Sequence, residues 1–290
     1  MPLDTTTIQA TDGRDLCLET CGNPFGRPIL FHSGTYAGRT LYPRLVEDAK
    51  QRGLFVIGYD RPGYGHSTAK TGRTIGDCAA DVVSIAQHFK LDRLATLGFS
   101  GGGAHSIASA VLIPDLVSAS VAFCSPMPPV IANIDFSGVN GEAEQNVENQ
   151  VFSEPPGFQA FLQKERAEIL TASQEKIVAD NMSMPDEQRV TLSFLEFHYR
   201  AMRSGLEPGI DGCLDDFHAY RSPWGFDLTT NRVPIGLWHG KMDATVPYRH
   251  SEWLSSKIPS SDLHLVEQDS HRSVFENNYE EALEWLLQFP

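Results

Sequence analysis

The chain has 290 residues, of which 41% are hydrophobic and 21% are charged, a composition typical of a globular protein with a full core rather than a disordered one. A formal net charge of −14 disfavours nonspecific binding to nucleic acid or to an anionic bilayer. We therefore expect a small-molecule substrate that is uncharged or modestly cationic. The length fits one large α/β domain with an insertion better than two ordinary domains.

No stretch of the sequence approaches the ~20 consecutive apolar residues of a membrane helix, and residues 1–10 contain no basic region followed by an apolar run. We expect a soluble protein that makes no membrane contact and stays in the cytoplasm. Five cysteines are scattered along the chain, and their odd number favours a reducing compartment over a disulfide framework. Cys17 and Cys21 are expected to be core residues, because no matching Cys/His pair completes a metal site.

Short apolar runs alternate with amphipathic stretches in the first part of the chain, which predicts βαβ units and a mostly parallel sheet. An antiparallel hairpin with its turn at Asp12-Gly13 precedes them. The expected elements are strands 6–10, 16–20 and 28–32, helix 42–52, strand 54–59, helix 74–89 with Thr74 as its N-cap, strand 94–98, helix 102–112 and strand 117–124.

After Pro126 the pattern becomes acidic and then helical, which indicates an inserted helical cap over residues 126–231. Residues 1–125 and 232–290 are expected to form the core domain. The expected cap helices are 158–170, 174–181 and 185–203, and the core resumes with strand 234–238, helix 248–257, strand 263–267 and a helix from 271 or 272 to 289.

The segment Gly98-Phe99-Ser100-Gly101-Gly102 lies between a predicted strand and a predicted helix. A serine on so sharp a turn needs neighbours without side chains, since its backbone is strained and the flanking chains approach closely. The following helix directs its N-terminal amides and dipole toward the serine, where they favour developing negative charge. Ser100 is the predicted nucleophile.

Residues 98–102, together with His32-Ser33-Gly34-Thr35 and residues 60–67 (DRPGYGHS), resemble the α/β-hydrolase superfamily over nearly the whole chain. The closest resemblance is to cap-bearing, esterase-like and proline-iminopeptidase-like members. It implies the α/β-hydrolase fold, a mostly parallel twisted sheet flanked by helices with an inserted helical cap. We expect residues 60–67 to be a structural turn rather than a substrate contact.

A serine hydroxyl needs a positioned base, and the family's chain order is serine, then acid, then histidine after the last strand. Only His271 follows the last predicted strand, whereas His264 falls inside it. Asp243 follows strand 234–238 and is the predicted acid that orients the base. His239 is expected only to close that strand.

Two backbone amides normally hold the oxygen of the attacked acyl group. Gly101 is one predicted donor by position, and the resemblance suggests the N–H of Thr35 as the other. The chain has Tyr36-Ala37 where the family commonly has Pro-Gly, so Tyr36 stays open as the alternative. Phe99 is expected to point into the scaffold. The predicted pocket residues are Ser33, Gly34, Tyr36 and Met127.

The sequence predicts a serine hydrolase that cleaves a carboxylic ester, lactone or small amide through an acyl-serine, without a metal or organic cofactor. Serine at position 100 disfavours dehalogenase and epoxide hydrolase chemistry, which need aspartate there. Cofactor-free perhydrolysis uses the same triad and stays open. A proline-iminopeptidase-like activity needs cap acids that bind a free amine, for which Glu142, Glu144 or Glu196 are candidates. The non-enzyme alternative is a ligand receptor on this fold.

Overall fold

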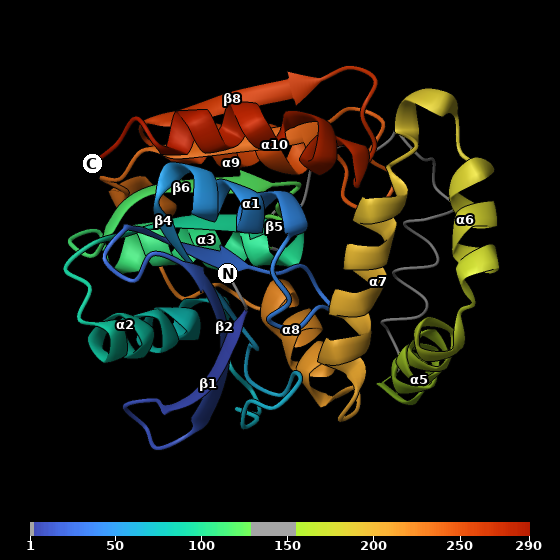
Figure 1. The fold of residues 1–290 in the computed structure, drawn as a ribbon, viewed down its shortest axis with the longest axis horizontal. Helices are drawn as coiled ribbons and strands as arrows, with labels where there is room; N and C mark the ends of the chain where they lie inside the picture. Colours follow the sequence, from blue (N-terminus) through green and yellow to red (C-terminus); the bar gives the residue numbers. More distant parts are fainter. Residues whose placement is uncertain (1–2, 129–154) are drawn as a thin grey trace.

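In the computed structural model, which describes residues 3–128 and 155–290, eight strands form one sheet in the order β1-β2-β4-β3-β5-β6-β7-β8 (Figure 1). The β1–β2 and β2–β4 pairs are antiparallel, and the other pairs are parallel. The predicted hairpin and fold class are confirmed. The strands are β1 (Asp4–Gln9), β2 (Asp15–Gly22), β3 (Arg27–His32), β4 (Leu54–Tyr59), β5 (Leu94–Phe99), β6 (Val117–Phe123), β7 (Ile235–Gly240) and β8 (Ser261–Val266).

Helices cover both faces of the sheet, and strands β4 to β7 are consequently buried along their whole length. Helices α1 (Pro43–Arg52) and α10 (Ser273–Leu286) share one apolar core with the sheet, around Tyr42 and Phe275. Helices α2 (Cys78–Phe89), α3 (Gly101–Leu112) and α9 (Arg249–Lys257) share the core on the other face.

Local sequence signals account for some of the helix boundaries. Helix α1 begins with Pro43, whose missing N–H costs nothing in a first turn, and ends at Gly53, which has φ 67°. The predicted helix 74–89 is divided into a 3-10 turn, Ile75–Asp77, and helix α2. The Asp77 carboxylate accepts hydrogen bonds from the Thr74 N–H (2.7 Å) and hydroxyl (2.9 Å), which fixes the start of that turn.

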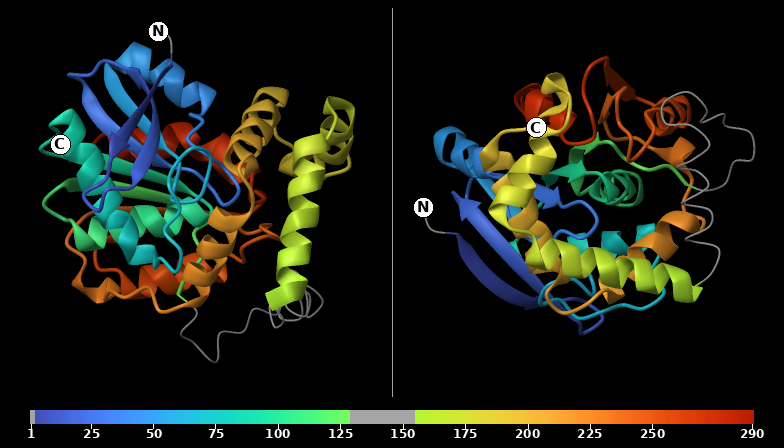
Figure 2. Two further views of the ribbon diagram at one scale, coloured as in Figure 1. Left: turned by 90° about the horizontal axis from the view of Figure 1, so that it is seen from below. Right: turned by 90° about the vertical axis from the view of Figure 1, so that its right-hand side faces the viewer.

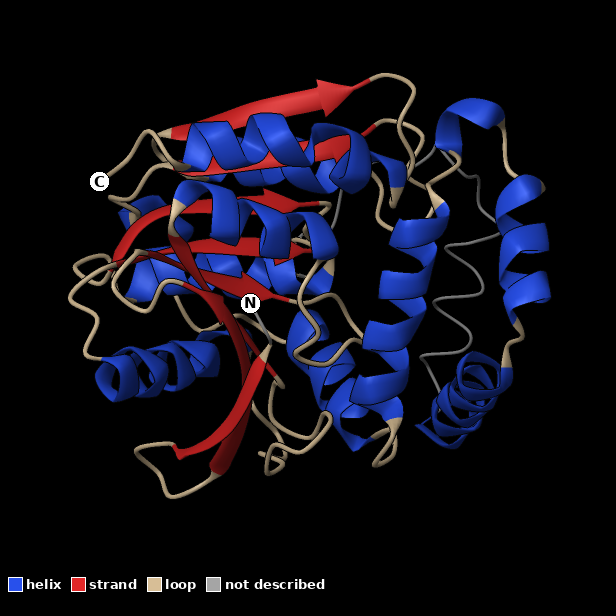
Figure 3. Ribbon diagram, viewed as in Figure 1, coloured by secondary structure: helices blue, strands red, loops and turns tan. Residues whose placement is uncertain are grey.

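Within residues 155–290, four further helices lie beyond the carboxyl ends of the parallel strands (Figures 2 and 3). We call them the insertion helices. The predicted helix 185–203 is wrong in its first part, because a 3-10 turn, Asp186–Gln188, precedes the helix proper. The last of the four was not predicted. The insertion helices are α5 (Pro155–Thr171), α6 (Gln174–Met182), α7 (Leu192–Leu206) and α8 (Asp211–Arg221).

Several aromatic side chains of the insertion helices pack as core. Phe194 and Phe197 join the cluster around Tyr42, and Phe158 joins a second cluster that contains Tyr64. Among residues 3–128 and 155–290, no helix combines the length and apolar character that crossing a membrane requires.

Candidate active site

Ser100 sits between strand β5 and helix α3 with φ 55° and ψ −127°, a strained conformation for a residue with a side chain. Its N–H donates to the carbonyl of Phe123 on the neighbouring strand at 2.8 Å. A Cβ atom on Gly98 would collide with the backbone of Gly102, and one on Gly102 would collide with the carbonyl of His32. The glycines of this segment are therefore required by close backbone packing.

His271 and Asp243 meet at the carboxyl ends of the last two strands. His271 Nδ1 lies 2.7 Å from Asp243 Oδ2, and the other carboxylate oxygen accepts the N–H groups of Thr245 and Val246 at 2.8 Å each. Burial alone raises the pKa of the Asp243 carboxyl, but its interactions with His271 and His239 outweigh burial and hold that pKa well below its usual range. Asp243 is therefore an ionised, oriented acceptor for the His271 ring.

The His271 ring lies close to the strand that carries the serine. Its centroid is 5.2 Å from the Phe99 ring, and Phe99 also packs against Phe275 of α10 at 4.9 Å. Phe99 thus points into the scaffold, as predicted. No hydrogen bond joins the side chains of Ser100 and His271 in the described part of the chain, and such contacts commonly tighten only when substrate binds.

His239 was expected only to close strand β7, and that interpretation is incomplete. Its Nε2 lies 3.1 Å from Asp243 Oδ2 and 2.7 Å from the carbonyl of Val246, while its Nδ1 lies 2.7 Å from the hydroxyl of Ser251. Two acceptors at Nε2 place the proton there, so the Ser251 hydroxyl donates to Nδ1. The acid therefore receives a second histidine donor, which the sequence did not reveal because it depends on the conformation of the loop after β7.

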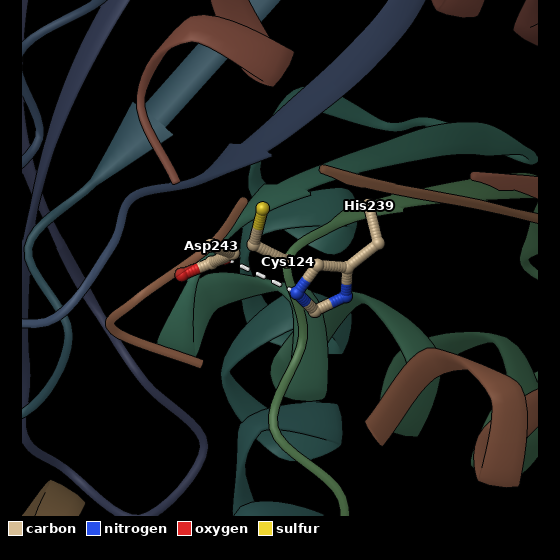
Figure 4. A group of neighbouring side chains, drawn as sticks. All are labelled: Cys124, His239 and Asp243. Atoms are coloured by element: carbon tan, nitrogen blue, oxygen red, sulfur yellow. Dashed lines mark hydrogen bonds and ion pairs between the residues drawn. The ribbon is translucent and has the colours of Figure 1, made fainter. Parts of the chain in front are cut away.

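Cys124, His239 and Asp243 form a group whose donor atoms lie within 4.8 Å of one another, all of them buried (Figure 4). Thiolate, imidazole and carboxylate are the donors that Zn²⁺ prefers. Burial and the neighbouring Asp243 carboxylate, however, raise the pKa of Cys124 well above its usual range. The histidine and the carboxylate already bond to other protein groups, so a metal ion there would take the acid from His271.

The predicted oxyanion residues come together above the nucleophile. A Cβ atom on Gly34 would lie 3.4 Å from the Cβ of Ser100, so the backbone of this loop covers the serine. A Cβ atom on Gly101 would collide with the side-chain oxygens of Thr35 and Tyr220. Those two oxygens lie 3.2 Å apart, so Thr35, Gly101 and Tyr220 of helix α8 lie next to one another.

The other predicted pocket residues have different surroundings. The Ser33 hydroxyl is buried and donates to the carbonyl of Gly38 at 2.8 Å, so it holds the loop together. Tyr36 has φ 72°, and its ring lies 6.2 Å from Phe217 of α8. Met127 is buried at the edge of the described residues, and its N–H donates to His250 Nδ1 at 3.0 Å.

The segment 60–67 is structural, as predicted. The buried carboxylate of Asp60 accepts the Arg39 N–H at 2.7 Å, the Arg39 guanidinium at 2.6 Å and the His66 N–H at 3.0 Å. Of the candidate amine-binding acids, Glu196 is exposed on α7 and accepts from Gln174 at 3.3 Å. Glu142 and Glu144 lie outside the described residues.

Comparison with known proteins agrees with this architecture. A family model of the alpha/beta hydrolase fold matches residues 27–278, so the chain belongs to the α/β-hydrolase fold family. Its relatives include a non-heme chloroperoxidase of Kitasatospora aureofaciens, 27% identical over 292 residues, which covers 93% of this chain and 92% of that protein. A proline iminopeptidase of Xanthomonas citri is 31% identical over 114 residues, 38% of this chain and 36% of that protein.

A solved structure extends the likeness to the whole fold. The esterase of Exiguobacterium antarcticum has a TM-score of 0.69 with this chain at 20% identity, and the match covers 98% of both chains. At this identity the likeness shows the shared fold.

Proposed function

We propose that the protein is a serine hydrolase that cleaves carboxylic esters, lactones or small amides, with Ser100 as nucleophile, His271 as base and Asp243 as acid. The observation that carries the proposal is the 2.7 Å contact between His271 Nδ1 and the buried Asp243 carboxylate. It leaves Nε2 of the ring to face substrate and serine. The insertion helices are proposed to act as the cap over this site.

The chemistry follows from these roles. Ser100 Oγ attacks the acyl carbon while His271 Nε2 takes its proton, and Asp243 stabilises the imidazolium that forms. The N–H groups of Thr35 and Gly101 receive the negative charge on the acyl oxygen. His271 then gives the proton to the leaving alcohol or amine, and water repeats the sequence to release the acid.

A second candidate is perhydrolysis, in which hydrogen peroxide replaces water in releasing the acyl group from Ser100. The near full-length similarity to a protein named as a non-heme chloroperoxidase favours it. An iminopeptidase-like activity receives less support, because Glu196 is exposed and paired with Gln174. The similar proline iminopeptidase of Xanthomonas citri also matches only 38% of the chain.

Turnover of p-nitrophenyl esters of increasing acyl length, of lactones and of prolyl amides tests the proposal and ranks the substrates. We expect ester or lactone turnover by the natural protein, and a loss of kcat of about 10⁴-fold or more in Ser100→Ala and in His271→Ala. Circular dichroism checks that both variants are folded. Undiminished turnover in either variant contradicts the proposed roles.

A further inference from the structure

Arg61 carries a guanidinium that is buried next to the loop of the proposed oxyanion hole. Its side chain is 1% exposed, and it donates to the backbone carbonyl of Ser33 and, at 3.1 Å, to that of Gly34. The same guanidinium donates to Asp216 Oδ2 at 2.7 Å through Nη2 and 3.2 Å through Nε. One buried cation thus joins two consecutive carbonyls of the loop after β3 to a carboxylate of α8.

The peptide geometry gives these contacts a consequence for Thr35. The carbonyl of Gly34 and the N–H of Thr35 belong to one planar trans peptide, so they point in opposite directions. The carbonyl is held on one side by Arg61 and by the N–H of Ala37 at 3.1 Å. The Thr35 N–H is thereby fixed in direction, and a cation at the carbonyl oxygen polarises the peptide and strengthens the N–H as a donor.

Asp216 of helix α8 is held in its ionised form by buried donors. Both Arg61 and Arg73 donate to Asp216, and the Tyr64 hydroxyl donates to it at 2.8 Å. Burial opposes ionisation of Asp216, but the two guanidinium groups hold the pKa of its carboxyl well below the usual range. Burial and Arg61 lower the pKa of the neighbouring His105 to about 3, so its ring is neutral. Asp216 is therefore an ionised partner, and through Arg61 it connects helix α8 to the oxyanion loop.

We propose that Arg61 is a positioning residue that orients and polarises the Gly34–Thr35 peptide toward the oxyanion, and that Asp216 makes this orientation depend on helix α8. The inference rests on the proposed hydrolase function. It adds that transition-state stabilisation at Thr35 is coupled to an insertion helix. Tyr220, from the same helix, contacts the Thr35 hydroxyl at 3.2 Å and strengthens that coupling.

Arg73 provides a matched control within the same cluster. It is also buried and bonded to Asp216, but its other acceptors are the carbonyls of Pro62 (3.3 Å) and Gly212 (2.9 Å), outside the oxyanion loop. Removal of either arginine costs a buried charge and a bond to Asp216. Only the removal of Arg61 takes a guanidinium donor away from the carbonyls of Ser33 and Gly34.

The test compares Arg61→Lys and Arg61→Met with Arg73→Lys and Arg73→Met. For each variant we would measure ester turnover, thermal unfolding and the affinity for a boronic acid that forms a tetrahedral adduct with the serine. In the Arg61 variants we expect kcat to fall by about 10- to 10³-fold, with KM within about threefold of the natural value. Boronic acid affinity should fall in parallel with kcat/KM. In the Arg73 variants we expect a similar drop in thermal stability and a kcat within about threefold.

Lysine keeps the charge but cannot reach two carbonyls and a carboxylate together, so Arg61→Lys should retain part of the activity that Arg61→Met loses. If Arg61→Met does not fold, the comparison of Arg61→Lys with Arg73→Lys decides. The role of Arg61 is overturned if the Arg61 and Arg73 variants lose equal stability and equal kcat. It is also overturned if the Arg61 variants change only in KM. Absence of turnover in the natural protein overturns the proposed function itself.

Discussion

The two halves of the candidate site are held in different ways. On the acid and base side, Asp243 and His271 are held by the loops after β7 and β8 and by His239, whose partner Ser251 lies on α9. On the oxyanion side, the loop after β3 is held by Arg61, whose counter-ion belongs to an insertion helix. The groups that bond to Asp243 therefore all belong to the core, and we infer that oxyanion binding, unlike the orientation of Asp243, depends directly on helix α8.

Among the substitutions that separate the two sides of the site, Asp243→Asn should have the largest effect, confined to the acid and base side. Both oxygens of Asp243 accept N–H groups, so the NH2 of an asparagine must face either His271, where it favours the wrong tautomer, or the N–H groups of Thr245 and Val246. We therefore expect kcat to fall by about 10⁴-fold. Boronic acid binding, which reports the oxyanion side, should change much less. Steady-state kinetics and inhibition by the boronic acid check this prediction. Equal losses of kcat and of boronic acid affinity would show that the two sides of the site are not held independently.

Asp216→Asn tests the oxyanion side through stability. It leaves two buried arginines without their carboxylate, so we expect a loss of about 3–5 kcal/mol in the free energy of unfolding at pH 7, measured with denaturant. The folded-state pKa of Asp216 is depressed, so its ionised form stabilises the fold above the unfolded value of about 4. That contribution is lost as the pH falls further, and the gap between natural protein and variant should shrink below about pH 4. A gap that widens in acid contradicts the ion-pair account.

His239→Phe should reduce activity less, because it removes one of several donors to the acid. A hydrogen bond to a charged group contributes about 1.5–3 kcal/mol, which corresponds to a loss of kcat of about 10- to 100-fold. His239→Gln retains a donor and serves as the matched variant, with a smaller loss expected. If both variants keep the natural kcat while folded, His239 supports only the strand end and does not position Asp243.

The smallest expected change in activity is that caused by substituting a cysteine. All five cysteines are free and buried, and Cys124 lies beside the acid with a raised pKa. A thiol-specific reagent should therefore label none of them rapidly in the native protein and all five after denaturation. Cys124→Ser is expected to keep kcat within about threefold. Fast inactivation by the reagent that Cys124→Ser abolishes would show the acid side to be open to solvent.

Much of the fold was predictable because its strands are short apolar runs between turn signals. Strand β4 has the predicted bounds, 54–59, and α3 begins one residue before the predicted 102. Helix α8 was missed because its sequence, DGCLDDFHAYR, is polar. Asp216 is buried there only because Arg61 and Arg73, distant in sequence, neutralise it, and one sequence does not reveal such a pairing.

The candidate site was also predictable from the sequence only in part. The serine turn and the chain order of Asp243 and His271 are local signals, which the sequence displays directly. The donors around them are not local, because His239 reaches Asp243 only through the conformation of the loop after β7. The role inferred for Arg61 likewise depends on where the carbonyls of Ser33 and Gly34 point.

The most direct test of the central claim is labelling of the native protein with a fluorophosphonate, followed by peptide mass spectrometry to locate the adduct. We expect one adduct per chain on Ser100, loss of ester turnover in proportion to labelling, and no adduct in His271→Ala on the same time scale. A native protein that hydrolyses esters but carries its adduct on another residue, or none at all, would contradict the proposed nucleophile.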